Sequence, residues 1–154
     1  MTFTASVEGC EEDFECQFFG WAQFMCEIIR GWNEELGKLY EKKYRFLWDR
    51  NTSFFIPIMF MASKSKELDG EMAKILDEYD KPYNEGIKLF LKPKNDNEYT
   101  PAECELILAV FERVDPDKFD NSDDDSNRWY RESYIVWIRM LKYAIENNKS
   151  IFYG

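Results

Sequence analysis

The stretch from Arg128 to Asn147 predicts one long helix, and the distribution of its apolar residues constrains the fold of the whole chain. These residues form two adjacent stripes, the first of Tyr130, Tyr134, Trp137, Ile138, Leu141, Ala144 and Ile145 and the second of Trp129, Val136, Met140 and Tyr143. At about 100° per residue the stripes together cover roughly 220° of the helix surface. The pattern favours a central helix of a bundle. The alternative is that the narrower stripe contacts a partner or a second copy in a homodimer.

Helical periodicity recurs in the rest of the chain. Apolar residues three and four positions apart between Trp21 and Leu36 indicate an amphipathic helix, with Gly37 as its stop. Thr100 to Glu103 matches a capping box with proline at the first helical position, and Pro116 closes that helix. Residues 87–92 alternate in polarity, which indicates either a short strand or a helical turn.

These patterns predict a mainly α fold, a single-domain helical bundle over residues 1–154. A chain of this length buries about 70% of the surface that its unfolded form exposes, so one core is sufficient. No internal repeat or Gly/Ser-rich linker divides it. The segments TFTASV and SIFYG near the two ends have strand character, and their pairing would add a minor two-stranded β element.

Targeting and redox signals indicate a cytoplasmic protein. The first 20 residues are acidic and lack the apolar core of a secretory signal. The longest apolar run, residues 54–62, is far shorter than the roughly 20 residues of a membrane-spanning helix. The four cysteines match neither a zinc pattern nor a disulfide framework. We therefore expect reduced thiols, no membrane association and no cofactor.

The chain contains no histidine. Imidazole metal ligands, Ser-His or Cys-His nucleophile pairs and the commonest general base are therefore excluded. Cys104 lies in the first turn of the capped helix, where the helix dipole can lower a thiol pKa. Its acidic neighbours oppose that shift, so a buried or idle thiol is the favoured interpretation.

Negative charge is concentrated in one region, which we call the acidic segment, residues 96–125. It holds 11 acidic and two basic residues, whereas the net charge of the whole chain is −10. The rest of the chain is therefore nearly balanced. This overall charge argues against direct binding to nucleic acid, because phosphate contacts require a cationic surface.

The six aspartates between Val114 and Asn127 suggest a calcium site, but their spacing does not fit an EF-hand loop. Counted from Asp115 the sixth position is Asp120, and counted from Asp120 it is Asp125, where the motif requires glycine. A catalytic carboxylate pair needs separated groups in a cleft, and DNSDDDSN shows no sign of burial. No metal or catalytic site is predicted.

Two interpretations of the aspartates remain. One is a solvated loop that caps the following helix, with Asp125 or Ser126 as the N-cap. The other is a docking surface for a basic protein, in which carboxylates steer the encounter and neighbouring aromatic residues anchor it. The predicted partner-binding residues are Asp115, Asp117, Asp120, Asp123, Asp124, Asp125, Trp129 and Tyr130.

Three stretches resemble a group of small, mostly helical bacterial immunity proteins, many of them encoded beside toxin genes. The stretches are FGWAQFMCEIIRGWNEELGKLY, EGIKLFLKPKNDNEYTPAECELI and WYRESYIVWIRMLKYAIENNKSIFYG. They share an aromatic-glycine helix start, a proline-capped helix with an early Glu-Cys, and a C-terminal aromatic helix followed by a short apolar strand. The resemblance implies a non-enzymatic inhibitor of a cognate toxin.

The favoured hypothesis is thus an immunity protein that occludes a basic toxin or nuclease and attracts it electrostatically through the acidic segment. A phage-type inhibitor or nucleic-acid mimic is one alternative, and it would need carboxylates spaced like phosphates. A carboxylate-based metal-dependent hydrolase is the enzymatic alternative.

Overall fold

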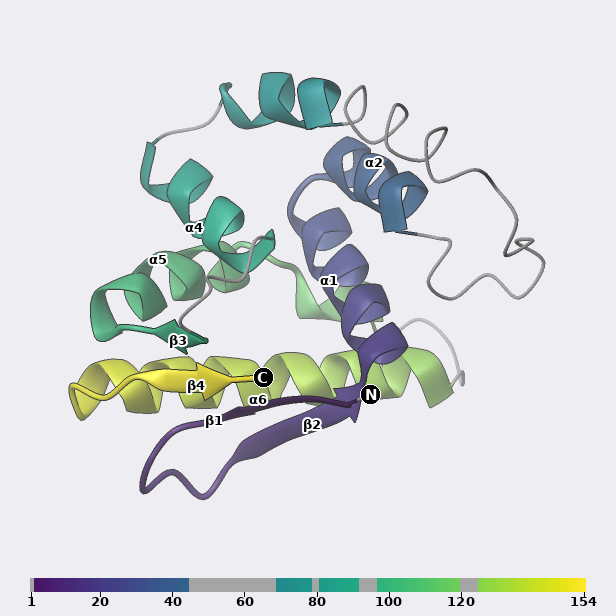
Figure 1. Ribbon diagram of the computed structural model, residues 1–154. Helices are drawn as coiled ribbons and strands as arrows, with labels where there is room; N and C mark the ends of the chain where they lie inside the picture. The colour runs from purple at the N-terminus through teal and green to yellow at the C-terminus, as the bar shows by residue number, and fades with distance from the viewer. Residues whose placement is uncertain (1, 45–68, 79–80, 92–96, 120–124) are drawn as a thin grey trace.

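The computed structural model describes residues 2–44, 69–78, 81–91, 97–119 and 125–154 (Figure 1). The helices are α1 (Phe18–Trp32), α2 (Glu34–Tyr44), α4 (Lys81–Leu91), α5 (Pro101–Glu112) and α6 (Asp125–Glu146), with helical residues at 69–76 and a 3₁₀ turn, η2 (Pro116–Phe119). The strands are β1 (Thr2–Ser6), β2 (Asp13–Gln17), β3 (Glu98–Tyr99) and β4 (Ile151–Tyr153). The predicted mainly α class is confirmed.

The strands form one antiparallel sheet with the order β2-β1-β4-β3. β1 pairs with β4, with Ala5 opposite Tyr153 and Ser6 opposite Phe152, so the expected pairing of the two terminal segments is confirmed. The expectation of only two strands is wrong, because β2 and β3 extend the sheet on both sides. β2 has only two inward-facing apolar residues and β3 is two residues long, so neither carries a strong local strand signal.

The core lies between the inner face of the sheet and the helices. Every second strand residue points inward: Phe3, Ala5, Phe14, Tyr99, Ile151 and Tyr153 are buried, and Cys16 is half-buried. α6 packs against α5, η2, α1 and the sheet, as Figure 1 shows for the helix running beside β4. Trp137 on α6 is completely buried, with ring-centroid distances of 5.3 Å to Trp21 and 5.7 Å to Phe14. The position of α6 agrees with the predicted central helix.

α1 and α2 form a hairpin that breaks at Asn33, and the predicted stop at Gly37 is wrong. Asn33 has extended dihedral angles, and its side-chain Oδ1 accepts a hydrogen bond from the Leu36 amide at 2.8 Å. Gly37 lies inside α2, where a Cβ would stand 2.6 Å from the Arg30 Cα. The glycine therefore permits close approach of two helices, a role that local sequence cannot distinguish from a helix stop.

The local signals of α4 and α5 are resolved by the structure. The alternating residues 87–91 belong to α4, so the helical turn is the correct alternative. The capping box of α5 is present: the Glu103 amide donates to Thr100 Oγ1 at 3.3 Å, and the Thr100 amide donates to Glu103 Oε1 at 3.1 Å. Reciprocal caps satisfy two backbone donors at the helix start, which fixes where α5 leaves β3.

Candidate interaction surface

The described part of the acidic segment carries exposed carboxylates along α5 and into η2. They are Glu105, Glu112, Asp115 and Asp117. Two other acids of the segment have local partners: Glu103 belongs to the capping box, and Glu98 accepts a 2.6 Å hydrogen bond from the Ser150 hydroxyl. Some carboxylates of the acidic segment therefore stabilise the fold, and others face solvent.

Asp115 and Asp117 lie at the start of η2 and face solvent. Asp115 Oδ1 accepts a 3.0 Å hydrogen bond from the Asp117 amide, which caps the 3₁₀ turn. Asp115 and Glu112 add to the effect of burial in raising the pKa of Tyr134 on α6. Their charges thus act together on the η2 side of α6. In the described ranges, no three Asp, Glu or Cys residues are grouped as ligands for a metal ion.

The remaining predicted aspartates are placed only in part. Asp120, Asp123 and Asp124 lie outside the described residues, and Asp125 is described only as the first residue of α6. α6 therefore starts three residues before the predicted Arg128, and both Asp125 and Ser126 lie within the helix rather than at its N-cap. The position of an N-cap cannot be read from composition where several capping residues follow one another.

Trp129 and Tyr130 are half-buried at the beginning of α6. The Trp129 ring packs at 6.4 Å from Phe14 and 6.1 Å from Phe24, so it contributes to the edge of the core. The Tyr130 ring lies 5.4 Å from Trp129, and Tyr130 lines a shallow pocket of about 100 Å³ beside α1 and α2. The structure therefore gives Trp129 a packing role and places Tyr130 at the wall of a pocket.

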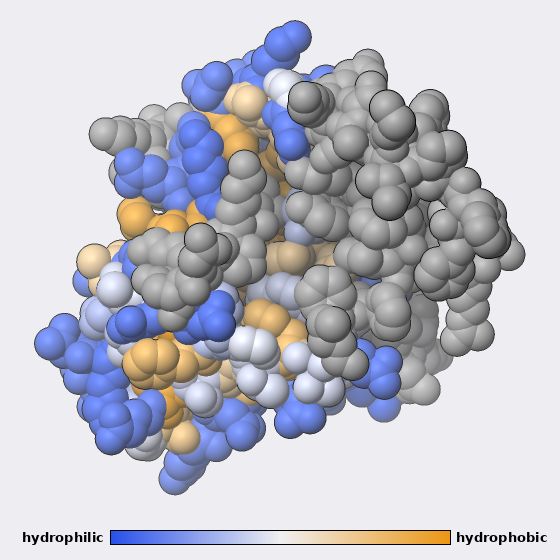
Figure 2. Space-filling model, in the orientation of Figure 1, coloured by the Kyte–Doolittle hydropathy of each residue, from blue (hydrophilic) through white to orange (hydrophobic). Residues whose placement is uncertain are grey.

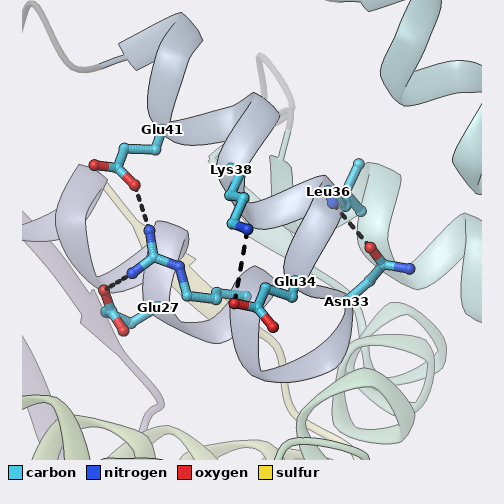
Figure 3. A network of polar contacts seen from close by, with 7 residues as sticks. Glu27, Asn33, Glu34, Leu36, Lys38 and Glu41 are labelled. Carbon is cyan, nitrogen blue, oxygen red and sulfur yellow. Dashed lines mark hydrogen bonds and ion pairs between the residues drawn. The ribbon is translucent and has the colours of Figure 1, made fainter.

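This pocket was not predicted from the sequence. Its other lining residues are Gln23, Cys26, Glu27, Arg30 and Glu41. Arg30 forms ion pairs with Glu27, at 3.0 Å, and with Glu41 (Figure 3). Burial raises the pKa of Glu27, Arg30 opposes the rise, and Glu41 adds to it. The three-residue spacing of Glu27 and Arg30 could have predicted their ion pair on one helix face. The ion pair of Arg30 with Glu41 depends on the α1–α2 hairpin, which the sequence did not indicate.

The pocket offers charge rather than a nucleophile. Burial is the main cause of a strongly raised pKa for the Cys26 thiol, and Glu41 and Glu27 raise it further. A protonated thiol is a poor nucleophile. Two carboxylates against one guanidinium leave the lining with an excess negative charge, so the pocket suits a cationic group better than an anion.

Cys104 is a buried thiol, in agreement with the favoured interpretation. Burial is the main cause that raises its pKa to about 12; a backbone hydrogen bond from Ile151 opposes this, and Glu103 adds to it. The Cys104 thiol donates to the Tyr99 carbonyl at 3.6 Å. Desolvation therefore raises the pKa of the Cys104 thiol by more than the helix dipole lowers it. The sequence alone could not show which of these two effects is larger.

We expect Cys104 to resist alkylation in the folded protein. At pH 8 iodoacetamide should modify it at least ~100-fold more slowly in the native state than in urea, because only the thiolate reacts and the native pKa is raised. Mass spectrometry of the Cys104 peptide measures both rates. Equal alkylation rates in the two states would contradict the assignment.

The raised pKa also links this thiol to stability. Since the folded pKa lies above the unfolded value, the Cys104 thiol favours folding below pH 9.0 and loses that contribution as pH rises toward about 12.

No family model, curated protein or solved structure matches this chain. Within the described residues, no helix is both long enough and apolar enough to cross a membrane. The chemistry of the surface is therefore the main guide to function.

Proposed function

We propose that this protein is a non-enzymatic binding protein that occludes a basic protein partner, as an immunity protein does with its cognate toxin. The observation that supports this most is the exposure of Asp115 and Asp117 at η2. The hydrogen bond between them joins the Asp117 amide to Asp115 Oδ1, so the Asp117 carboxylate takes no part in it. Carboxylates turned inward around an ion or into the core would not be accessible to a partner. These two face solvent.

The expected mechanism is electrostatic steering followed by docking. A segment with 11 acidic and two basic residues produces a local negative field, which raises the encounter rate of a cationic surface and disfavours acidic competitors. The field acts over about 8 Å at physiological salt, so the first contacts form close to η2 and the start of α6. The half-buried Tyr130 then offers an aromatic contact next to a pocket with excess negative charge.

Co-expression tests the proposed function. A basic protein co-purified with this chain from its own cells should inhibit growth when expressed alone, and co-expression of this chain should restore growth. Restored growth supports occlusion of a toxin. Inhibition that persists, despite soluble expression of both chains, would reject the immunity role.

The charge mechanism has its own test. We expect the double substitution Asp115→Asn and Asp117→Asn to slow association with that basic protein by about three- to ten-fold at low salt, and to flatten the salt dependence. Stopped-flow fluorescence measures the rate. The control is Glu71→Gln with Asp77→Asn, which changes the net charge equally at exposed positions in and just after helical residues 69–76. Equal slowing by both pairs would show that only net charge matters and would argue against a local site.

A further inference from the structure

The outward face of the sheet combines small polar residues, carboxylates and one aromatic ring. Its residues are those that alternate with the buried ones on each strand: Thr2, Thr4 and Ser6 on β1, Asp13, Glu15 and Gln17 on β2, Glu98 on β3 and Phe152 on β4. Three of these eight residues are acidic and none is basic.

Phe152 is the unusual member of this face. The residue is 53% exposed, and it is the one large hydrophobic residue in the described part of the chain that is exposed to this degree. Its strand neighbours Ile151 and Tyr153 point into the core, so the alternation of β4 fixes Phe152 on the outside. Figure 2 shows hydrophobic surface over the position of β4, bordered by hydrophilic residues.

The strand register places small residues and carboxylates around Phe152. One row across the sheet runs Asp13, Ser6, Phe152, Glu98, as the pairs Ser6–Asp13, Ser6–Phe152 and Glu98–Phe152 show. Beside this row, Thr4 forms backbone hydrogen bonds with Gly154 in both directions, at 2.8 and 3.0 Å. Serine, threonine and glycine are too small to cover an aromatic ring, so the ring remains accessible between two acidic positions.

Strand spacing sets the scale of this arrangement. Neighbouring strands lie about 4.8 Å apart, so Glu98 stands one strand from Phe152 and Asp13 stands two strands away, at roughly 10 Å. Glu15 lies opposite Thr4, in the same column of β2 as Asp13. A lysine or arginine side chain can therefore place its charged end over the ring, within reach of the Asp13 carboxylate on one side. On the other side Glu98 already accepts a hydrogen bond from the Ser150 hydroxyl and adds negative charge.

We propose that the outward face of the sheet, centred on Phe152, receives a lysine- or arginine-bearing segment of the basic partner. This inference rests on the proposed function for the nature of the partner and adds the surface that holds it. The acidic segment attracts the partner, and the sheet face retains a basic side chain through ring contact and paired charge. Charge complementarity selects a cationic segment, because the ionisable residues that the described strands place on this face, Asp13, Glu15 and Glu98, are all acidic.

A peptide titration tests the proposal. The probe is acetyl-Gly-Arg-Lys-Arg-Gly-amide, added to the ¹⁵N-labelled full chain and followed by amide chemical shifts. We expect saturable shifts at β1, β2 and β4. Phe152→Thr should weaken binding about two- to five-fold, the range that a cation over an exposed ring contributes. Threonine is chosen because its β-branched side chain keeps the strand propensity.

Two further variants separate the charge contribution from the ring contribution. Asp13→Asn with Glu15→Gln should weaken binding at low salt and lower its salt dependence, whereas the control Glu71→Gln with Asp77→Asn should leave the sheet shifts unchanged. An unchanged ¹⁵N spectrum outside the substituted positions shows that each variant is folded.

The outcomes distinguish this inference from the proposed function. Shifts confined to residues 112–119 and 125–130, with the sheet amides unmoved, would overturn the sheet proposal and leave occlusion by the acidic segment in place. A peptide affinity equal in the wild type and in Phe152→Thr would also overturn it. The proposed function is decided separately by growth in the co-expression experiment, where failure would leave any measured peptide site without its expected biological partner.

Discussion

Replacing Trp137 by alanine is expected to lower the free energy of unfolding by about 3–5 kcal/mol, the usual cost of removing a large aromatic side chain from a packed core. Trp137 is 0% exposed and contacts Phe14 and Trp21 at centroid distances of 5.7 and 5.3 Å. These neighbours belong to β2 and α1, so the resulting cavity would lie where the sheet and two helices meet. Urea denaturation followed by far-UV circular dichroism measures the change.

Trp137→Phe is the matched control. Among the described residues the buried indole Nε1 has no hydrogen-bond partner, so phenylalanine removes a donor that the fold does not satisfy. Phenylalanine also keeps most of the apolar contact. We expect a loss of only about 1–2 kcal/mol, less than half the loss for alanine. If alanine and phenylalanine destabilise equally, a hydrogen bond of the indole, rather than its volume, is the more important contribution.

Gly86→Ala is expected to destabilise the protein by about 1–3 kcal/mol, although alanine is the better helix former by about 1 kcal/mol. A Cβ at Gly86 on α4 would stand 2.4 Å from the Leu106 carbonyl oxygen and 2.9 Å from Val110 Cγ2. Both atoms belong to α5, and one is backbone, so the two helices would have to separate. Thermal unfolding measures the effect as a lower Tm.

Gly70→Ala is the control, with the opposite sign. Gly70 is helical and exposed, and a Cβ there meets nothing within 4 Å. Alanine should therefore stabilise the protein by about 0.5–1 kcal/mol through backbone entropy alone. A gain in stability at both positions would show that α4 and α5 are not in such close contact.

Local patterns predicted the elements whose formation depends on neighbours in sequence. The doubled apolar face of α6 and the capping box at Thr100 and Glu103 are properties of contiguous residues, and both are present. The pairing of β1 with β4 followed from strand propensity near both ends. β2 and β3 were missed because their stability comes from pairing across the sheet rather than from their own composition.

In the candidate site, too, the features set by local sequence could be predicted and those set by tertiary contacts could not. Exposure of Asp115 and Asp117 was expected from the polarity of the surrounding segment. The Glu27–Arg30–Glu41 ion pairs were not, because they require the turn at Asn33 to bring α2 back along α1. Exposure of Phe152 could not be read from IFY either, where all three residues are apolar and only the sheet register decides which one faces outward.

The sheet order also has a consequence for folding during synthesis. β1 is made first of the four strands and β4 last, yet they are neighbours, with Ser6 opposite Phe152. Until β4 emerges from the ribosome, the β1–β2 hairpin has an unpaired inner edge that other chains can join. The long sequence separation of this pair makes closure of the sheet a late and slow step. We therefore expect nascent chains to be more prone to aggregate than the finished protein.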